Sequence, residues 1–133
     1  MSVNPVTVLI ADDDTLVREA YKAVLEQRGH VVLVAEDGAR AIALVESGHV
    51  DVVLLDILMP RKEGLETLIE LKRQFPRLTI FAMSGGTVRN KTDFLSIAMK
   101  FGADGILRKP FEPQVLIDLI EGRQTGARRT QGG

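Results

Sequence analysis

The chain contains no cysteine and no tryptophan, and aromatic residues make up only 5% of its 133 residues. Without cysteine there is no disulfide framework, no thiolate metal site and no thiol nucleophile. Zinc ribbons, thioredoxin-like redox proteins and cysteine proteases are therefore excluded. A chain of this length forms one domain that buries roughly two-thirds of the surface exposed by its unfolded form, so it folds without disulfides.

The sequence also lacks an excess of charge of either sign and any long apolar run. Its 17 Lys and Arg residues and 18 Asp and Glu residues give a formal net charge of -1. Binding to nucleic acid or to anionic membranes depends on a surplus of basic residues, so we expect neither as a direct partner. No apolar run approaches the roughly 18 residues of a membrane-spanning helix, and the N-terminal run is no signal peptide. We expect a cytoplasmic protein.

Five short apolar runs, rich in β-branched residues, predict strands at residues 6–11, 31–35, 52–55, 78–83 and 106–107. They are apolar at consecutive positions, which is typical of parallel strands covered on both faces. The segments between them repeat apolar residues at helical spacing, as Leu65, Leu68 and Ile69 do in the third. The sequence therefore predicts an α/β fold, a doubly wound five-stranded parallel sheet with helices on both faces.

The last residues of the sequence differ in composition from the rest. Residues 122–133 are rich in Gly, Arg, Gln and Thr and contain almost nothing apolar. Such a segment cannot bury enough surface to become ordered. We expect one domain over residues 1–121 and a flexible tail over residues 122–133.

Polar residues follow the predicted strands, where ligands bind in open α/β sheets. These residues come from separate segments of the chain and are Asp12, Asp13, Asp14, Asp56, Ser84 and Lys109. Each has a structural explanation when taken alone; Asp14, for example, could cap the first helix. Asp56 is harder to explain in this way, because it ends the most apolar run in the chain and is expected to be partly desolvated.

A cluster of carboxylates at this edge needs a cation. Two carboxylates about 4 Å apart repel each other by roughly 4 kcal/mol at an effective dielectric constant near 20. The two histidines, His30 and His49, are expected to be solvated, so the site has oxygen ligands only, which favours Mg²⁺, with Mn²⁺ as a possible substitute. A divalent ion, a lysine and a hydroxyl around one carboxylate form a phosphoryl-transfer site, with Asp56 as the nucleophile.

Four motifs in order resemble those of a receiver domain of a two-component response regulator. They are VLIADDD at residues 8–14, DVVLLDILMP at 51–60, AMSG at 82–85 and LRKPF at 107–111. The resemblance covers about residues 5 to 121. It implies the strand order 2-1-3-4-5 that flavodoxin shares with CheY, the chemotaxis receiver.

The resemblance also implies roles for individual residues. Asp12, Asp13, Asp56 and the backbone carbonyl of Leu58 would hold Mg²⁺. Asp56 would accept phosphate from a histidine kinase or a histidine phosphotransfer protein. On this basis the protein is a signalling switch, not an enzyme acting on other substrates, and it catalyses only its own phosphorylation and slow dephosphorylation.

The resemblance further implies how the switch operates. Ser84 and Lys109 would contact the phosphoryl oxygens, and the Lys109–Pro110 peptide bond would be cis. Phosphorylation adds a charge of about -1.5 to -2, which would draw Ser84 and the loop at 85–90 inward. The face formed by the fourth helix, the fifth strand and the fifth helix would then change its binding to an output protein of unknown identity.

The sequence departs from the receiver pattern in three respects. Ile106 occupies a position where many receivers carry an aromatic residue that follows the hydroxyl, so we expect coupling to run through the loop. Leu58 and Gly86 stand where polar side chains can orient the water that hydrolyses an acyl phosphate, so we expect a long-lived phosphorylated state. The segment near residues 87–90 looks longer than usual.

Three alternative functions fit the sequence less well. Asp12 and Asp14 resemble the opening of haloacid-dehalogenase-type phosphatases, but no acidic pair follows Lys109 on a strand, as those enzymes require. A flavin protein would need backbone donors and hydroxyls for its phosphate where this sequence has aspartates. A receiver-like module that binds partners without phosphorylation would have no need of the acidic cluster.

Overall fold

Five parallel strands form one sheet in the order β2-β1-β3-β4-β5, as the resemblance implied. The computed structural model describes residues 4–59, 63–85 and 94–125. The strands are β1 (Thr7–Ala11), β2 (Val31–Ala35), β3 (Val52–Asp56), β4 (Thr79–Ser84) and β5 (Gly105–Arg108). The helices are α1 (Thr15–Gln27), α2 (Gly38–Glu46), α3 (Glu63–Gln74), α4 (Phe94–Lys100) and α5 (Pro113–Thr125). None of these described helices is long and apolar enough to cross a membrane.

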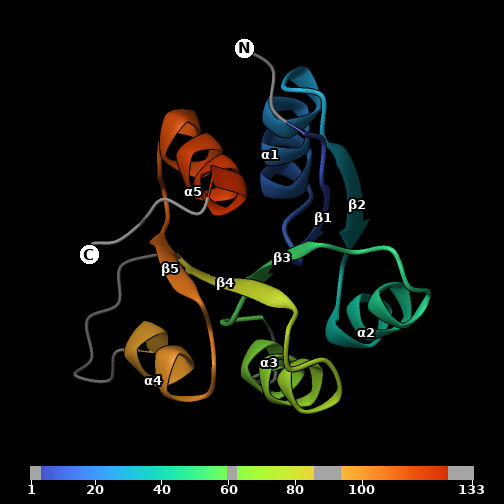
Figure 1. Cartoon of the computed structure of the whole chain (residues 1–133). Helices are drawn as coiled ribbons and strands as arrows, with labels where there is room; N and C mark the ends of the chain where they lie inside the picture. The colour runs from blue at the N-terminus through green and yellow to red at the C-terminus, as the bar shows by residue number, and fades with distance from the viewer. Residues whose placement is uncertain (1–3, 60–62, 86–93, 126–133) are drawn as a thin grey trace.

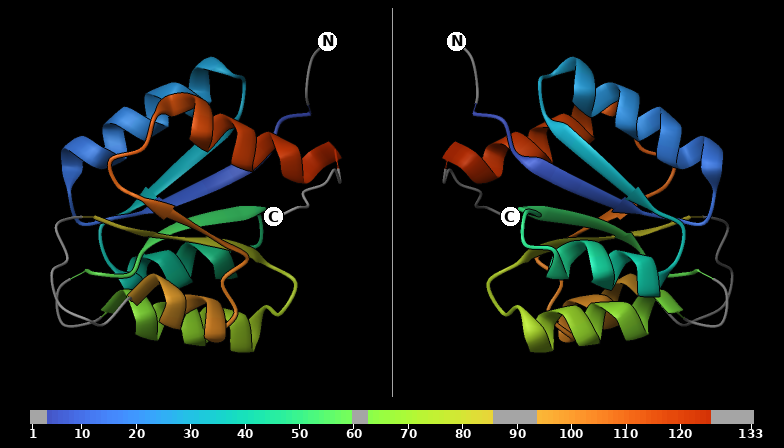
Figure 2. Two further views of the ribbon diagram at one scale, coloured as in Figure 1. Left: turned by 90° about the vertical axis from the view of Figure 1, so that its left-hand side faces the viewer. Right: turned by 90° about the vertical axis from the view of Figure 1, so that its right-hand side faces the viewer.

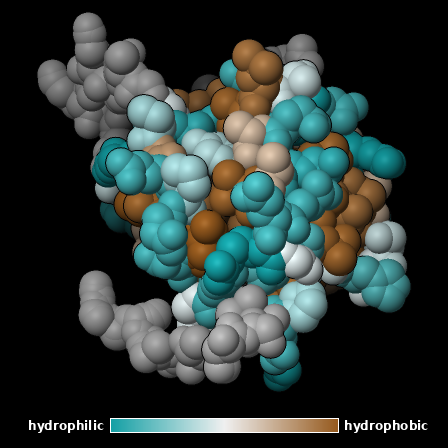
Figure 3. Space-filling model, turned by 90° about the horizontal axis from the view of Figure 1, so that it is seen from above, coloured by the Kyte–Doolittle hydropathy of each residue, from teal (hydrophilic) through white to brown (hydrophobic). Residues whose placement is uncertain are grey.

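Helices cover both faces of the sheet, α1 and α5 on one and α2, α3 and α4 on the other (Figures 1 and 2). Successive side chains of a strand point to opposite faces. Leu55 of β3 therefore packs in the core under α2, α3 and α4, whereas Leu54 packs in the core under α1 and α5. A strand that contributes to both cores therefore needs apolar residues at consecutive positions. Seen from the side of α1 and α5, the surface has scattered hydrophobic residues among hydrophilic ones (Figure 3).

Helix α5 continues past the expected end of the domain. The boundary predicted at Glu121 lies inside the helix, which runs to Thr125. The remainder of the predicted tail, residues 126–133, lies outside the described residues.

The buried face of α3 differs from the one that the apolar pattern predicted. Ile69 is 40% exposed, while Gly64, Thr67, Leu68 and Leu71 are buried. The reason is close packing at small residues, because a Cβ at Gly64 would overlap the backbone at the end of β3. This contact turns the Gly64 side of α3 toward the sheet and leaves Ile69 on the outside.

His30 is buried, so the expectation that it is solvated was wrong; His49 is exposed. Nδ1 of His30 accepts a hydrogen bond from the backbone N–H of Val6 at 3.2 Å, and Nε2 lies 3.1 Å from a carboxylate oxygen of Glu121. Because Nδ1 is an acceptor, Nε2 carries the proton and donates to Glu121. His30 thus joins the start of β1 to the end of α5.

Candidate functional site

The carboxyl ends of four strands meet at one edge of the sheet and bring the predicted site residues together. In the parallel register, Asp56 at the end of β3 is paired with Met83 of β4, and Ser84 is paired with Arg108 of β5. Lys109 follows directly, and its backbone N–H donates to the carbonyl of Ser84 at 2.8 Å. The register therefore places the carboxylate of Asp56, the hydroxyl of Ser84 and the side chain of Lys109 on neighbouring chain segments.

The carboxylates of Asp12, Asp13 and Asp56 form a cluster in which one oxygen of each lies within 4.8 Å of the others. Asp12 is fully buried and Asp56 is 6% exposed, whereas Asp13 is exposed. The donor set consists of hard oxygen atoms with one side open to solvent. It fits a Mg²⁺ ion, which prefers carboxylate oxygens and keeps several of its waters.

The side chain of Lys109 reaches into this cluster. Its Nζ lies 2.6 Å from Asp12 Oδ2 and 3.4 Å from Asp56 Oδ2. Burial lowers the pKa of Lys109, but the hydrogen bond to Asp12 and the charges of both carboxylates outweigh it, so the pKa lies above its usual value. The charged form of Lys109 is therefore favoured beside both buried aspartates.

Asp56 is held in a defined orientation at the end of β3. Its Oδ1 accepts a hydrogen bond from the backbone N–H of Leu58 at 2.9 Å, and the N–H of Ile57 donates to the carbonyl of Met83 at 3.0 Å. Burial raises the pKa of Asp56, and the Leu58 hydrogen bond and the charge of Lys109 only partly offset this. The carboxylate is thus desolvated and held in a fixed direction, the state that an oxygen nucleophile requires.

Asp14 has a different role from the two aspartates before it. Its Oδ1 accepts hydrogen bonds from the backbone N–H groups of Leu16 at 2.9 Å and Val17 at 3.3 Å, so it caps α1. This confirms the structural explanation of Asp14. It also leaves Asp14 outside the cluster, where the phosphatase alternative would have needed it as an acid.

A stacked aromatic pair supports the segment that carries Lys109. The Lys109–Pro110 peptide bond is cis, the conformation that the resemblance implied. The ring of Phe111 stacks on Tyr21 of α1, with centroids 4.6 Å apart and planes 8° from parallel. Burial raises the pKa of Tyr21. Sequence reasoning assigned Tyr21 only to the apolar face of the first helix, because nothing in the sequence indicates its partner on a segment 90 residues away.

The other predicted residues that the structure describes lie on β4, just after β3 and on β5. Ser84 ends β4 and is buried, and the backbone of Leu58 follows Asp56 while its side chain is 38% exposed. Ile106 of β5 points outward, and Leu107 beside it is buried. Gly86 and the predicted longer loop at 87–90 lie outside the described residues.

Sequence reasoning missed one further residue at this edge, Arg18 of α1. Its guanidinium donates from Nη1 to the backbone carbonyl of Asp12 at 2.8 Å. The sequence offers no clear signal for this contact, because an arginine on the first turns of a helix is more often a surface residue.

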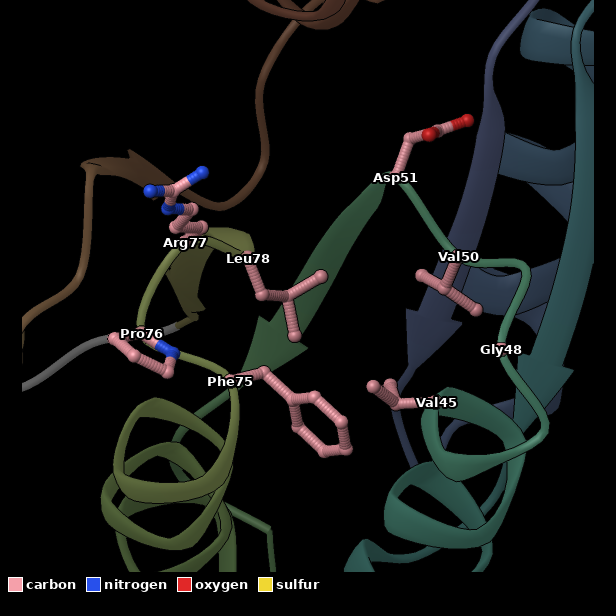
Figure 4. Close-up of a pocket in the computed structure, with 8 residues that line it drawn as sticks. All are labelled: Val45, Gly48, Val50, Asp51, Phe75, Pro76, Arg77 and Leu78. Atoms are coloured by element: carbon pink, nitrogen blue, oxygen red, sulfur yellow. The ribbon is translucent and has the colours of Figure 1, made fainter.

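A separate cavity of about 550 Å³ lies at the opposite edge of the sheet, between the α2–β3 and α3–β4 connections. Figure 4 shows the apolar side chains of Val45, Val50, Phe75 and Leu78 pointing into it. The charged groups of Asp51 and Arg77 point away from its centre. The cavity has no part in the acidic cluster.

Comparisons with known proteins agree with this geometry. Residues 8–121 match the response regulator receiver domain family. The transcriptional regulatory protein CpxR of Klebsiella pneumoniae is 36% identical over 113 residues, which are 85% of this chain and 47% of CpxR. The response regulator MprA of Mycolicibacterium vanbaalenii is also 36% identical, over 85% of this chain and 48% of MprA.

Among solved structures, the CheY-like response regulator receiver domain protein of Methanospirillum hungatei superposes with a TM-score of 0.82 and 27% identity. The match covers 92% of this chain and 95% of that one. By contrast, the chain spans about half the length of the curated relatives. With the strand order and the aspartate cluster, these matches establish that the chain belongs to the receiver domains of response regulators, the phosphate-accepting modules of two-component systems.

Proposed function

We propose that Asp56 accepts a phosphoryl group from the phosphohistidine of a histidine kinase or a histidine phosphotransfer protein, in a reaction that requires Mg²⁺. One observation carries this proposal: a desolvated carboxylate ends β3 beside two further carboxylates and within 3.4 Å of a lysine ammonium. In the reaction, an oxygen of Asp56 attacks phosphorus, the P–N bond breaks, and the imidazole leaves with the bonding electrons and takes up a proton.

The acidic cluster supplies the metal site of this proposal. Asp12, Asp13, Asp56 and the backbone carbonyl of Leu58 would hold the ion, and Mn²⁺ could replace Mg²⁺. A cation held there would supply positive charge to offset that of the phosphoryl oxygens. The residues of the chain do the rest: Lys109 offers its ammonium to another phosphoryl oxygen, and the Leu58 N–H keeps Asp56 in place.

The output of the switch lies at Ser84 and Lys109. Phosphorylated Asp56 carries about -1.5 to -2 charge and three acceptor oxygens, for which the Ser84 hydroxyl and the Lys109 ammonium are the donors. Because Ser84 and Lys109 are joined by a backbone hydrogen bond, movement of one is passed to the other. The face of α4, β5 and α5, which includes exposed Ile106, then changes its affinity for an output partner. Lys109→Ala should leave phosphorylation possible while uncoupling this response, as hydrogen exchange on α4–β5–α5 would measure.

The phosphorylated state is proposed to be long-lived. The side chain of Leu58 is apolar and partly exposed beside Asp56, so it cannot orient a hydrolytic water. The domain then acts as a switch with slow self-dephosphorylation and no activity on other substrates. Leu58→Asn should shorten the lifetime of the purified phosphoprotein several-fold, on the scale of about 1 kcal/mol for one positioned hydrogen bond, while Leu16→Asn, at another exposed leucine, should leave it unchanged.

Nucleic-acid binding by the domain itself is not part of the proposal. CpxR is named a transcriptional regulatory protein, but it is about twice as long as the match. The expectation that this domain makes no direct contact with nucleic acid or membrane stays a prediction, as does its cytoplasmic location.

The test is phosphoryl transfer from acetyl phosphate at increasing Mg²⁺ and in chelator. Asp13→Asn should raise the Mg²⁺ concentration needed for half-maximal phosphorylation by about tenfold, because it removes a proposed metal ligand. Asp118→Asn on the exposed surface of α5 is the matched control and should behave as wild type. Transfer that proceeds equally well in chelator would contradict the metal site. Absence of transfer from any donor would favour an unphosphorylated binding module.

A further inference from the structure

Arg18 lies on the first turn of α1 and reaches back to the loop that carries Asp12 and Asp13. Its Nη1 donates to the carbonyl oxygen of Asp12 at 2.8 Å, and its Nη2 donates to the hydroxyl of Thr15 at 3.2 Å. Within the described residues, no carboxylate lies at ion-pair distance from its guanidinium. The guanidinium is therefore fixed to a backbone carbonyl and not to an acidic side chain.

With this contact, each of three consecutive peptide planes is held by a hydrogen bond. The plane before Asp12 is held by the hydrogen bond from Asp12 N–H to the carbonyl of Ala35 at 3.1 Å. The plane after Asp13 is held by the bond from Asp14 N–H to Asp12 Oδ1 at 2.9 Å. The plane between them joins Asp12 to Asp13, and Arg18 is the donor that holds it. Since a peptide unit is planar, fixing the Asp12 carbonyl fixes the direction in which Asp13 leaves the strand.

The geometry uses properties that arginine has and lysine lacks. Two nitrogens of a planar guanidinium contact two acceptors at once, whereas a single ammonium on a flexible stem cannot span them in the same way. The third nitrogen, Nε, is buried and has no hydrogen-bond partner, the only such side-chain atom among the described residues. A buried donor without a partner is unfavourable, so the side chain is held in this position by its other two nitrogens.

We infer that Arg18 is a positioning residue for the metal site: by holding the Asp12 carbonyl, it directs the carboxylate of Asp13 toward those of Asp12 and Asp56. The inference rests on the proposed function, because it assigns Arg18 to the same Mg²⁺ site. The direction of the change in Mg²⁺ affinity on loss of Arg18 distinguishes this role from a simple effect of charge. A positive charge near the site by itself weakens cation binding, whereas a positioning contact strengthens it.

The test is Mg²⁺ affinity of the unphosphorylated protein, measured by titration calorimetry. Arg18→Lys keeps the charge but loses the two-point contact, and should weaken Mg²⁺ binding by about tenfold, as the loss of such supporting contacts typically does. Thr15→Val removes one acceptor of the guanidinium on the exposed surface, where folding is not at risk, and should weaken binding by about threefold. Arg77→Lys, at the opposite edge of the sheet, is the matched control and should bind as wild type.

A second readout separates positioning from general damage. At saturating Mg²⁺, phosphorylation of both variants by acetyl phosphate should approach the wild-type rate, so the defect lies in the Mg²⁺ requirement. Wild-type Mg²⁺ affinity in Thr15→Val and in folded Arg18→Lys would overturn the inference while leaving the proposed function intact; if Arg18→Lys does not fold, Thr15→Val decides alone. A wild-type protein that binds no Mg²⁺ would overturn both.

Discussion

The ammonium of Lys109 lies 2.6 Å from Asp12 Oδ2, closer than the 3.4 Å that separates it from Asp56. Asp12 is fully buried, so this bond compensates a charge that solvent cannot reach. We therefore expect the lysine to stabilise the unphosphorylated fold, and it lies close enough to Asp56 for the proposed contact with a phosphoryl group there.

Replacing Lys109 by alanine should lower the free energy of unfolding by about 2 kcal/mol in chelator, because it leaves buried carboxylates without their cation. Adding Mg²⁺ should reduce the difference from wild type, since the ion compensates the same charges. Chemical denaturation with and without Mg²⁺ measures both. Lys22→Ala, which removes a surface pair with Glu26 at 3.6 Å, is the control and should change stability by less than about 0.5 kcal/mol. Equal effects of the two substitutions would contradict this account.

Asp56→Asn should raise the free energy of unfolding by about 1 kcal/mol in chelator, since it removes one of three mutually repelling carboxylates from a desolvated site. The pKa of Asp56 is raised mainly by burial and to a smaller extent by the charge of Asp12, and both effects disfavour its charged form. In Mg²⁺ the gain should vanish or reverse, because the variant has lost a metal ligand. Thermal unfolding in the two conditions is the measurement, with Asp118→Asn as control. A variant less stable than wild type in chelator would contradict the proposed repulsion.

Glu121 should contribute pH-dependent stability. Arg28 donates to both of its carboxylate oxygens, at 2.6 and 2.9 Å, and buried His30 donates a third bond. The Arg28 hydrogen bonds, with a further contribution from His30, hold the pKa of Glu121 below its usual value of 4.5. A carboxylate with a lowered pKa stabilises the fold above its unfolded pKa, and this stability is lost as the pH falls through the folded pKa.

Glu121→Gln should therefore lower the free energy of unfolding by about 0.5–1 kcal/mol at neutral pH, a modest value because the side chain of Arg28 is 46% exposed to solvent. The difference from wild type should shrink as the pH falls below 4.5. Denaturant titrations at several pH values measure it, and Glu26→Gln is the control. If the difference in unfolding free energy between wild type and Glu121→Gln grew toward acid pH, the predicted direction of the pH dependence would be wrong.

Much of the fold could be predicted because it depends on local pattern. Residues 52–55 are apolar at consecutive positions because they pack into the cores on both faces of the sheet, and this pattern predicted a buried parallel strand. The face of α3 could not be read in the same way. Ile69 fits the apolar repeat but is exposed, because the close approach of Gly64 to β3 sets the rotation of the helix.

The acidic part of the site could also be predicted, because carboxyl ends of parallel strands meet at one edge. Contacts between elements that lie far apart in the sequence could not be predicted. His30 lies 91 residues before Glu121, and no spacing indicates that they meet. The bond from Arg18 to Asp12 depends on a backbone direction that becomes visible only with the β1–α1 loop in place.

Gly64→Ala should be strongly destabilising and should also impair phosphorylation. An added Cβ would overlap the carbonyl oxygen of Asp56 and the Cα of Ile57, so α3 or the end of β3 has to move. We expect a loss of about 2 kcal/mol or more in the free energy of unfolding and slower phosphorylation at saturating Mg²⁺. Gly122→Ala is the matched control: its Cβ meets no atom within 4 Å and should stabilise α5 by about 0.5 kcal/mol. Similar behaviour of the two variants would contradict the close packing of α3 on β3.

The most direct test of the central claim is the mass of the intact protein and of its peptides after incubation with acetyl phosphate, in Mg²⁺ and in chelator. We expect one phosphoryl group on the wild-type protein, located on Asp56 and present only with Mg²⁺, and none on Asp56→Asn. A phosphoryl group on another residue, or an Asp56→Asn protein labelled as fully as wild type, would contradict it.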